Sequence, residues 1–103
     1  MSEKTIERIK DMEPRFDKAS EVVCGTGEAL DALEKTLPDI LAFSEYYGSE
    51  DWFEDVDSYN RGEVPGDVKC GVLAEDLPYD LIIDAHELAL RMLKAALAIL
   101  ENI

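Results

Sequence analysis

Apolar residues recur twice in every seven positions over the first forty residues of the chain. One position of this repeat holds Ile9, Phe16, Val23, Leu30 and Leu37, and the other holds Met12, Ala19, Thr26, Leu33 and Ile40. Alternating steps of three and four residues place these side chains on one stripe of an α-helix. The pattern predicts one long helix from about residue 6 to about residue 41.

Prolines and glycines interrupt this pattern. Pro14 cannot donate an amide hydrogen to the carbonyl of Lys10, which predicts a bend near residue 14. The register is the same on both sides of Gly25-Thr26-Gly27, which favours one continuous helix over the alternative of two stacked helices. At Leu37-Pro38-Asp39 we expect a stop followed by a short helix through Tyr46, because Pro and Asp are favoured in the first turn of a helix.

The second half of the chain begins with a break at Gly48. Ser49 is a suitable N-cap for a helix from Glu50 to about Tyr59. The stretch from Asn60 to Val72 is a loop by its glycine and proline content. A last helix is expected to start near Ala74-Glu75-Asp76 and to run to the C-terminus.

The polar residues of this last helix form one narrow stripe. They are Asp80, Asp84, Glu87, Arg91, Lys94 and Glu101. A helix that is apolar over most of its circumference must be covered on two or more sides. We therefore expect an all-α fold in one domain, residues 1–103. In it an antiparallel pair of long helices, with short helices and a loop between them, forms a three- to four-helix bundle.

The composition narrows the classes of partner. The 103 residues include 24 Asp and Glu against 10 Lys and Arg, a net charge of -14. This sign repels phosphate backbones and anionic lipid, so neither nucleic acid nor a membrane surface is expected as a partner.

Cys24 and Cys70 show no CxxC spacing and are expected to be reduced thiols of a cytoplasmic protein. The longest apolar run, Ala95 to Leu100, is too short to span a bilayer.

Acidic and aromatic residues gather in the middle of the chain. Between Glu45 and Asp80 there are eleven acidic residues and two basic ones, and seven of the eight aromatic residues lie between Phe43 and Tyr79. Tyr and Trp dominate interface hot spots, so this segment is a candidate partner-binding surface. Its candidate residues are Tyr46, Tyr47, Asp51, Trp52, Glu54 and Asp55. The alternative is that the aromatic residues form core at the end of the helical pair.

The same segment carries a family resemblance. The runs from Tyr46 to Asp55, from Gly71 to Asp76 and from Tyr79 to Leu81 are similar to those of small bacterial proteins grouped as a domain of unknown function, number 4298. The resemblance covers almost the whole chain and implies a cytoplasmic bacterial helical protein with no known activity. Ala74 stands where such proteins typically have Ser, which removes a side-chain cap from the start of the last helix.

Patterns that would indicate catalysis are weak. Acidic pairs three residues apart, as in helical nucleotide pyrophosphohydrolases, occur at Glu28/Asp31 and Asp84/Glu87, but neither pair lies on an apolar face. Glu54, Asp55 and Asp57 do not fit the spacing of an EF-hand and are interpreted as an exposed acidic turn, with looser magnesium or calcium binding as the alternative. His86 is the one histidine and has no nucleophile motif beside it. The sequence therefore predicts no catalytic residue, metal site or cofactor.

The favoured function is a non-catalytic protein-protein interaction module. The nearly apolar last helix suggests a homodimer formed through it. Two alternatives stay open. One is an acidic decoy that mimics nucleic acid and binds a basic protein, and the other is a small metal-dependent nucleotide hydrolase.

Overall fold

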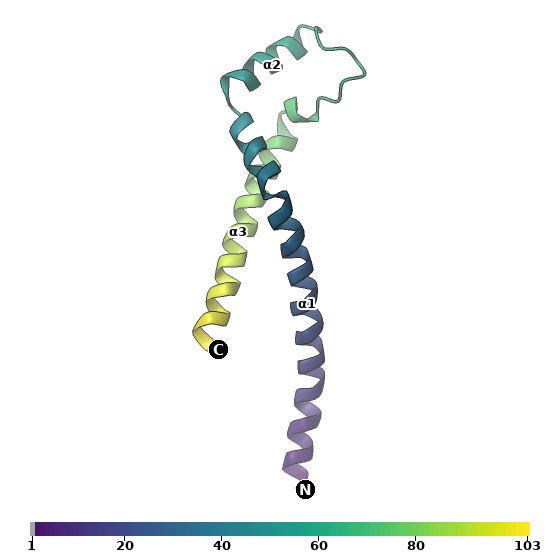
Figure 1. Cartoon of the computed structure of the whole chain (residues 1–103), viewed down its shortest axis with the longest axis vertical. Helices are drawn as coiled ribbons and strands as arrows, with labels where there is room; N and C mark the ends of the chain where they lie inside the picture. Colours follow the sequence, from purple (N-terminus) through teal and green to yellow (C-terminus); the bar gives the residue numbers. More distant parts are fainter. Residues whose placement is uncertain (1) are drawn as a thin grey trace. The chain divides into compact units, whose positions relative to one another are not determined.

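The computed structural model describes residues 2–103, which form α-helices and one short 3-10 helix with no strand among them. The elements are α1 (Glu3–Tyr46), α2 (Glu50–Asn60), η1 (Gly71–Leu73) and α3 (Asp76–Asn102). Figure 1 shows them coloured along the chain. The chain divides into two compact units, Met1–Ile40 and Leu41–Ile103. The all-α prediction is confirmed.

Helix α1 is continuous over 44 residues, which confirms one long helix in place of two stacked ones. The glycines do not break it, and there is open space where a Cβ would lie at Gly25 and at Gly27. It also passes through Pro14 and Pro38. The bend near Pro14 stays a prediction.

The expected stop at Leu37-Pro38-Asp39 is wrong, and so is the separate short helix through Tyr46. Pro38 has no backbone N–H, so one hydrogen bond of the helix is missing there. A helix end at this position would instead leave several N–H and C=O groups on each side without a hydrogen-bond partner. A second helix would also need a new nucleus, which is the unfavourable step of helix formation. Continuing through the proline therefore costs less than stopping and starting again.

The turn between α1 and α2 is built by Gly48 and Ser49. Gly48 has a φ of 81°, a left-handed conformation that glycine adopts without steric cost. The Ser49 hydroxyl donates to the Tyr46 carbonyl at 2.6 Å and accepts from the Trp52 amide at 3.2 Å. The predicted N-cap is therefore confirmed, and α2 begins at the expected residue.

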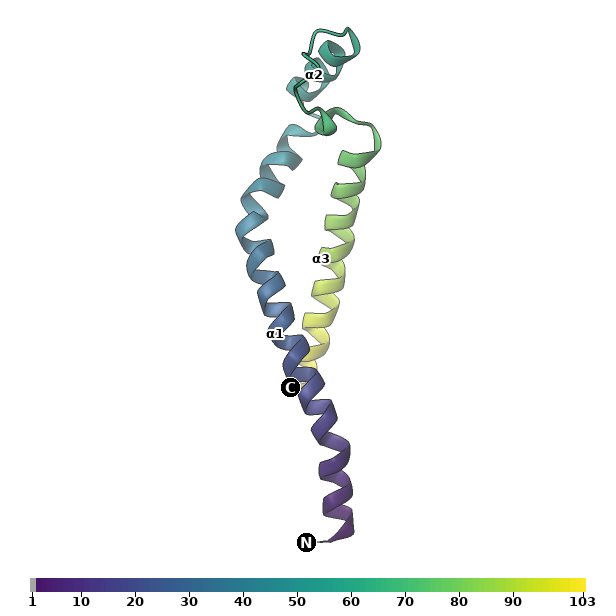
Figure 2. The ribbon, with the colours of Figure 1, turned by 90° about the vertical axis from the view of Figure 1, so that its right-hand side faces the viewer.

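After α2 the chain turns at Gly62, whose φ is 75°, and runs as a loop to η1. Figure 2 shows η1 between the loop and the first turn of α3. Helix α3 starts within two residues of the predicted position and continues to Asn102. No side chain caps its first turn, as the alanine at position 74 led us to expect.

Burial is sparse throughout. Pro78 is the one residue that is buried among residues 2–103, and no large apolar side chain in this range is buried. Each unit by itself therefore leaves apolar side chains open to solvent. Hydrophobic burial is the dominant favourable contribution to folding, and residues 2–103 show little of it.

Candidate functional site

An aromatic cluster joins the end of α1 to the start of α2. The ring of Tyr47 stacks on Phe43 with centroids 6.0 Å apart, and it meets the Trp52 ring edge to face at 5.1 Å. Trp52 in turn contacts Phe53 edge to face at 5.1 Å. Edge-to-face and offset arrangements are the favourable ones for aromatic pairs. The cluster fixes the direction in which α2 leaves α1.

Trp52 also ties α2 to η1. Its indole Nε1 donates to the Val72 carbonyl at 2.9 Å, across twenty positions of the chain. Trp52 is half-buried, and its one polar atom is satisfied by this bond. The side chain therefore acts as a structural contact within the Leu41–Ile103 unit.

Tyr46 makes a second contact between helices α1 and α2. Its phenol donates to a carboxylate oxygen of Asp55 at 2.6 Å. This bond to Asp55, together with desolvation and the negative charges of Asp55 and Asp51, raises the pKa of Tyr46 from 10.0 to about 12. The neutral phenol is favoured because only that form can donate the bond.

A pH titration tests this bond. Because the pKa of Tyr46 is higher in the folded chain, the stability from the bond is fully present below pH 10 and is lost as the pH rises toward 12. Tyr46→Phe should remove an absorbance step near pH 12 at the tyrosinate wavelength. It should also flatten the loss of stability between pH 10 and 12. Identical titration curves for the variant and the parent chain would contradict the assignment.

The candidate residues divide into two groups. Tyr46, Tyr47 and Trp52 are half-buried and make the contacts just described, with Asp55 held by Tyr46. Asp51 and Glu54 are exposed on α2. The six therefore do not form one uniform outward patch: the aromatic residues support the fold locally, and the free carboxylates face solvent.

The six candidate residues predicted from the sequence do not include Phe53, which is 58% exposed on α2 beside these carboxylates. Its position next to the tryptophan in the acidic run was the available signal.

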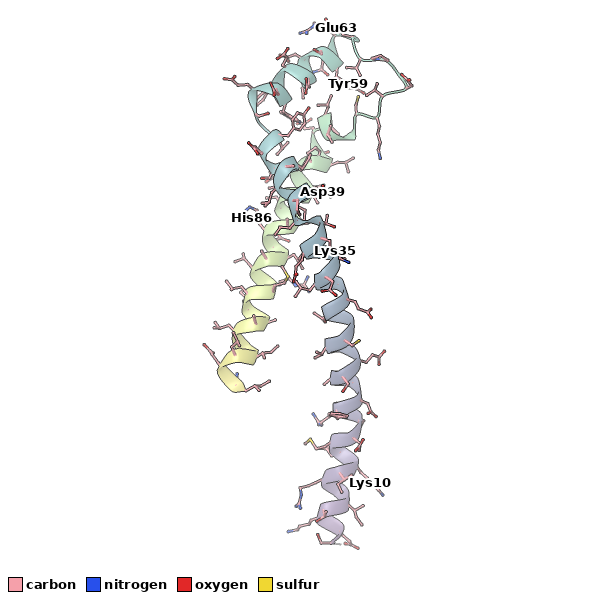
Figure 3. All side chains as sticks on the ribbon, in the orientation of Figure 1. Lys10, Lys35, Asp39, Tyr59, Glu63 and His86 are labelled. Atoms are coloured by element: carbon pink, nitrogen blue, oxygen red, sulfur yellow. The ribbon has the colours of Figure 1, made fainter. Side chains whose placement is uncertain are left out.

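At the end of α2, near Tyr59 and Glu63 in Figure 3, the Arg61 guanidinium binds the Glu63 carboxylate, with Nε to Oε1 at 2.8 Å. The hydrogen bond to Glu63, together with the negative charges of Asp57 and Glu54 on α2, raises the pKa of Arg61.

An open groove of about 470 Å³ lies beside η1, also undetected from the sequence. It is lined by Phe43, Lys69, Gly71, Val72, Leu77, Pro78 and Leu81. The lining is apolar apart from the Lys69 side chain. No spacing pattern could reveal this groove, because its walls come from three elements and a loop.

Many of the exposed apolar side chains of the Leu41–Ile103 unit lie along α3. Leu90, Leu93, Leu97 and Leu100 are each more than half exposed, and Leu100 is 78% exposed. Figure 3 shows side chains standing out from α3 along its length, past the labelled His86. These exposed apolar side chains make α3 a candidate interaction surface.

Chemistry-bearing residues are not grouped in the described part of the chain. Among residues 2–103 no three His, Cys, Asp or Glu side chains lie close enough together to hold a metal ion. His86 is exposed on α3, and Cys24 and Cys70 are free thiols. Among the same residues, no helix combines the length and apolarity needed to cross a bilayer.

The comparison with protein families finds one model, described as a domain of unknown function (DUF4298), which matches residues 9–95. The match includes α2, η1, the groove and most of α1 and α3. No curated protein matches the sequence.

Proposed function

The chain belongs to the DUF4298 family, and we propose that it is a non-catalytic protein-protein interaction module that forms a homodimer through its C-terminal helix. The observation that carries this proposal is the exposed apolar surface of α3 in a chain whose described residues bury no large apolar side chain. A helix that is apolar around most of its circumference gains stability only when other helices cover it. Two copies of the chain supply such cover to each other.

The proposal includes the antiparallel pairing of α1 with α3 inside one chain. Two features support it. The heptad stripe of α1 is largely exposed, with Phe16 at 68% and Val23 at 71%. Helix α3 has apolar residues on more than one side, so one side can pack on α1 and another on a second copy. Together these helices would form a bundle.

The acidic outer surface of α2 is proposed as a second contact, for a partner protein with a basic surface. Asp51 and Glu54 are exposed, and Phe53 offers an aromatic contact next to them. Tyr46, Tyr47 and Trp52 hold this helix in place. A cytoplasmic location is part of the same proposal, since Cys24 and Cys70 are free thiols.

The molar mass of the intact protein in solution tests self-association. Light scattering at about 50 µM should give twice the chain mass of 11.5 kDa. Dilution should shift the mass toward one chain and lower the helical circular dichroism, because the apolar faces lose their cover. A single-chain mass at all concentrations, with undiminished helicity, would refute the homodimer.

The response to salt distinguishes partner binding at the acidic surface of α2 from self-association through the apolar surface of α3. Binding of a basic protein to the acidic surface should weaken strongly between 50 and 500 mM salt, because exposed charges are screened. Self-association through α3 should persist over this range, since hydrophobic burial is not screened. Complete dissociation of the homodimer by salt would contradict the apolar interface.

A further inference from the structure

The exposed side of α3 has the pattern of a coiled-coil seam. It consists of Ile83, His86, Leu90, Leu93, Leu97 and Leu100, spaced by alternating steps of three and four; we call these residues the leucine seam. Its four leucines are 54–78% exposed. On the other apolar side of the helix, Leu81, Leu88 and Met92 are each less than half exposed and Ile99 is 56% exposed. Within the leucine seam Ile83 is 38% exposed, so the greater exposure of the seam lies at its four leucines, from Leu90 onward.

We propose that the leucine seam packs antiparallel against the leucine seam of a second copy. This inference rests on the proposed homodimer and adds the surface, the orientation and the register. When the two seams overlap along their full length, each seam residue lies opposite one seam residue of the second copy. The numbers of the two facing residues always sum to 183. Ile83 then faces Leu100 of the second copy, and Leu90 faces Leu93. Each of these layers occurs twice by two-fold symmetry.

The charges bordering the leucine seam favour this orientation. Glu87 and Lys94 follow one border, seven residues apart. In the antiparallel register Glu87 lies opposite Lys94 of the second copy, and the symmetry makes this pair twice. In a parallel arrangement the residues facing Glu87 and Lys94 would be Ile82 and Ala89, so neither charge would have a partner. Such pairs contribute more to orientation than to affinity.

The other border of the leucine seam carries small residues, which allow the two α3 helices of the dimer to lie close together. Ala89 lies opposite Ala96 of the second copy in the same register, and both side chains are small. At the two ends, Asp80 faces Glu101 of the other chain, a like-charge contact at exposed positions that salt screens. Two attractive pairs therefore lie at the centre of the overlap, and the repulsive pairs lie at its two ends.

His86 is the one polar residue of the leucine seam, and in this register it faces Leu97 of the second copy. A polar side chain at such a position lowers stability while specifying the register. Replacing His86 with Leu should therefore tighten the dimer. Replacing Leu93 with Lys should dissociate it, because a charge would enter the centre of the seam twice.

Charge exchange on the full chain tests the orientation. Glu87→Lys places Lys opposite Lys94, and Lys94→Glu places Glu opposite Glu87, so each variant should dimerise about tenfold more weakly than the parent. Mixed together, the two variants should form a heterodimer in preference to either homodimer, because both contacts are then complementary. The double variant Glu87→Lys with Lys94→Glu should regain the parent affinity. Sedimentation velocity measures all four samples.

Asp84→Lys is the matched control. It changes the charge of α3 by the same amount as Glu87→Lys but lies off the leucine seam, so its dimer should be at least as stable as that of the parent chain. Glu87→Lys lowers the net negative charge of each copy, which by itself would favour association, so a weaker dimer reports the local contact. Circular dichroism at high concentration confirms that each variant is helical.

The outcomes separate the two proposals. A monomeric parent chain would overturn both the homodimer and its register. A dimeric parent with no preference for the heterodimer in the mixture, and no rescue in the double variant, would overturn the antiparallel seam alone. A heterodimer together with rescue supports both.

Discussion

Replacing Trp52 with Ala should lower the free energy of unfolding of the Leu41–Ile103 unit by about 2–3 kcal/mol. Three contacts are lost together: the edge-to-face packing on Tyr47, the same packing on Phe53, and the hydrogen bond to the Val72 carbonyl. The expected loss is below that for a fully buried tryptophan because Trp52 is half-buried. Urea unfolding followed by circular dichroism at 222 nm measures it.

Trp52→Phe is the matched variant for this prediction. It keeps an aromatic ring between Tyr47 and Phe53 and removes the indole N–H, so it should lose only about 1 kcal/mol, the value of one hydrogen bond. If Trp52→Ala unfolded at the same urea concentration as the parent chain, Trp52 would be a surface residue free to bind a partner. A large loss identifies it as a structural contact of the α2 segment.

The sequence was most informative where one local rule decided the structure. Ser49 marked the start of α2 because a serine side chain satisfies a free amide of the first helical turn, and the structure contains that bond. The heptad repeat predicted the long helix because its phase continues across Gly25 and Gly27. The start of α3 near Asp76 followed from the change from loop composition to apolar spacing.

Contacts between distant residues were beyond local rules. The bond from Trp52 to Val72 spans twenty positions, and the groove beside η1 is lined from three elements and a loop. Neither follows from periodicity, which reports only which side of its own helix a residue occupies. Charge and aromatic content placed the candidate surface between Phe43 and Asp80, and its role in binding a partner stays a prediction. They could not show which aromatic rings were already engaged by their neighbours.

Pro38 is the clearest case of a local rule overruled by its surroundings. Replacing Pro38 with Ala should raise the free energy of unfolding by about 2–3 kcal/mol, close to the difference between these residues in a helix interior. Alanine restores the amide donor to the Glu34 carbonyl and removes the ring that crowds it. Part of this gain is offset, because proline also restricts the unfolded chain.

Pro14→Ala is the comparison for this measurement, since Pro14 also lies inside α1 but far from the division between Ile40 and Leu41. If proline acts only through its low helix propensity, Pro14→Ala and Pro38→Ala should show similar increases over the parent chain. The increases should appear both in the helical circular dichroism signal and in the urea concentration needed for unfolding. A gain at Pro14 with a loss at Pro38 would mean that the backbone geometry imposed by Pro38 is required by the native packing. Pro38 would then be a structural determinant of the fold, and its local cost would be offset by the contacts that this geometry makes available.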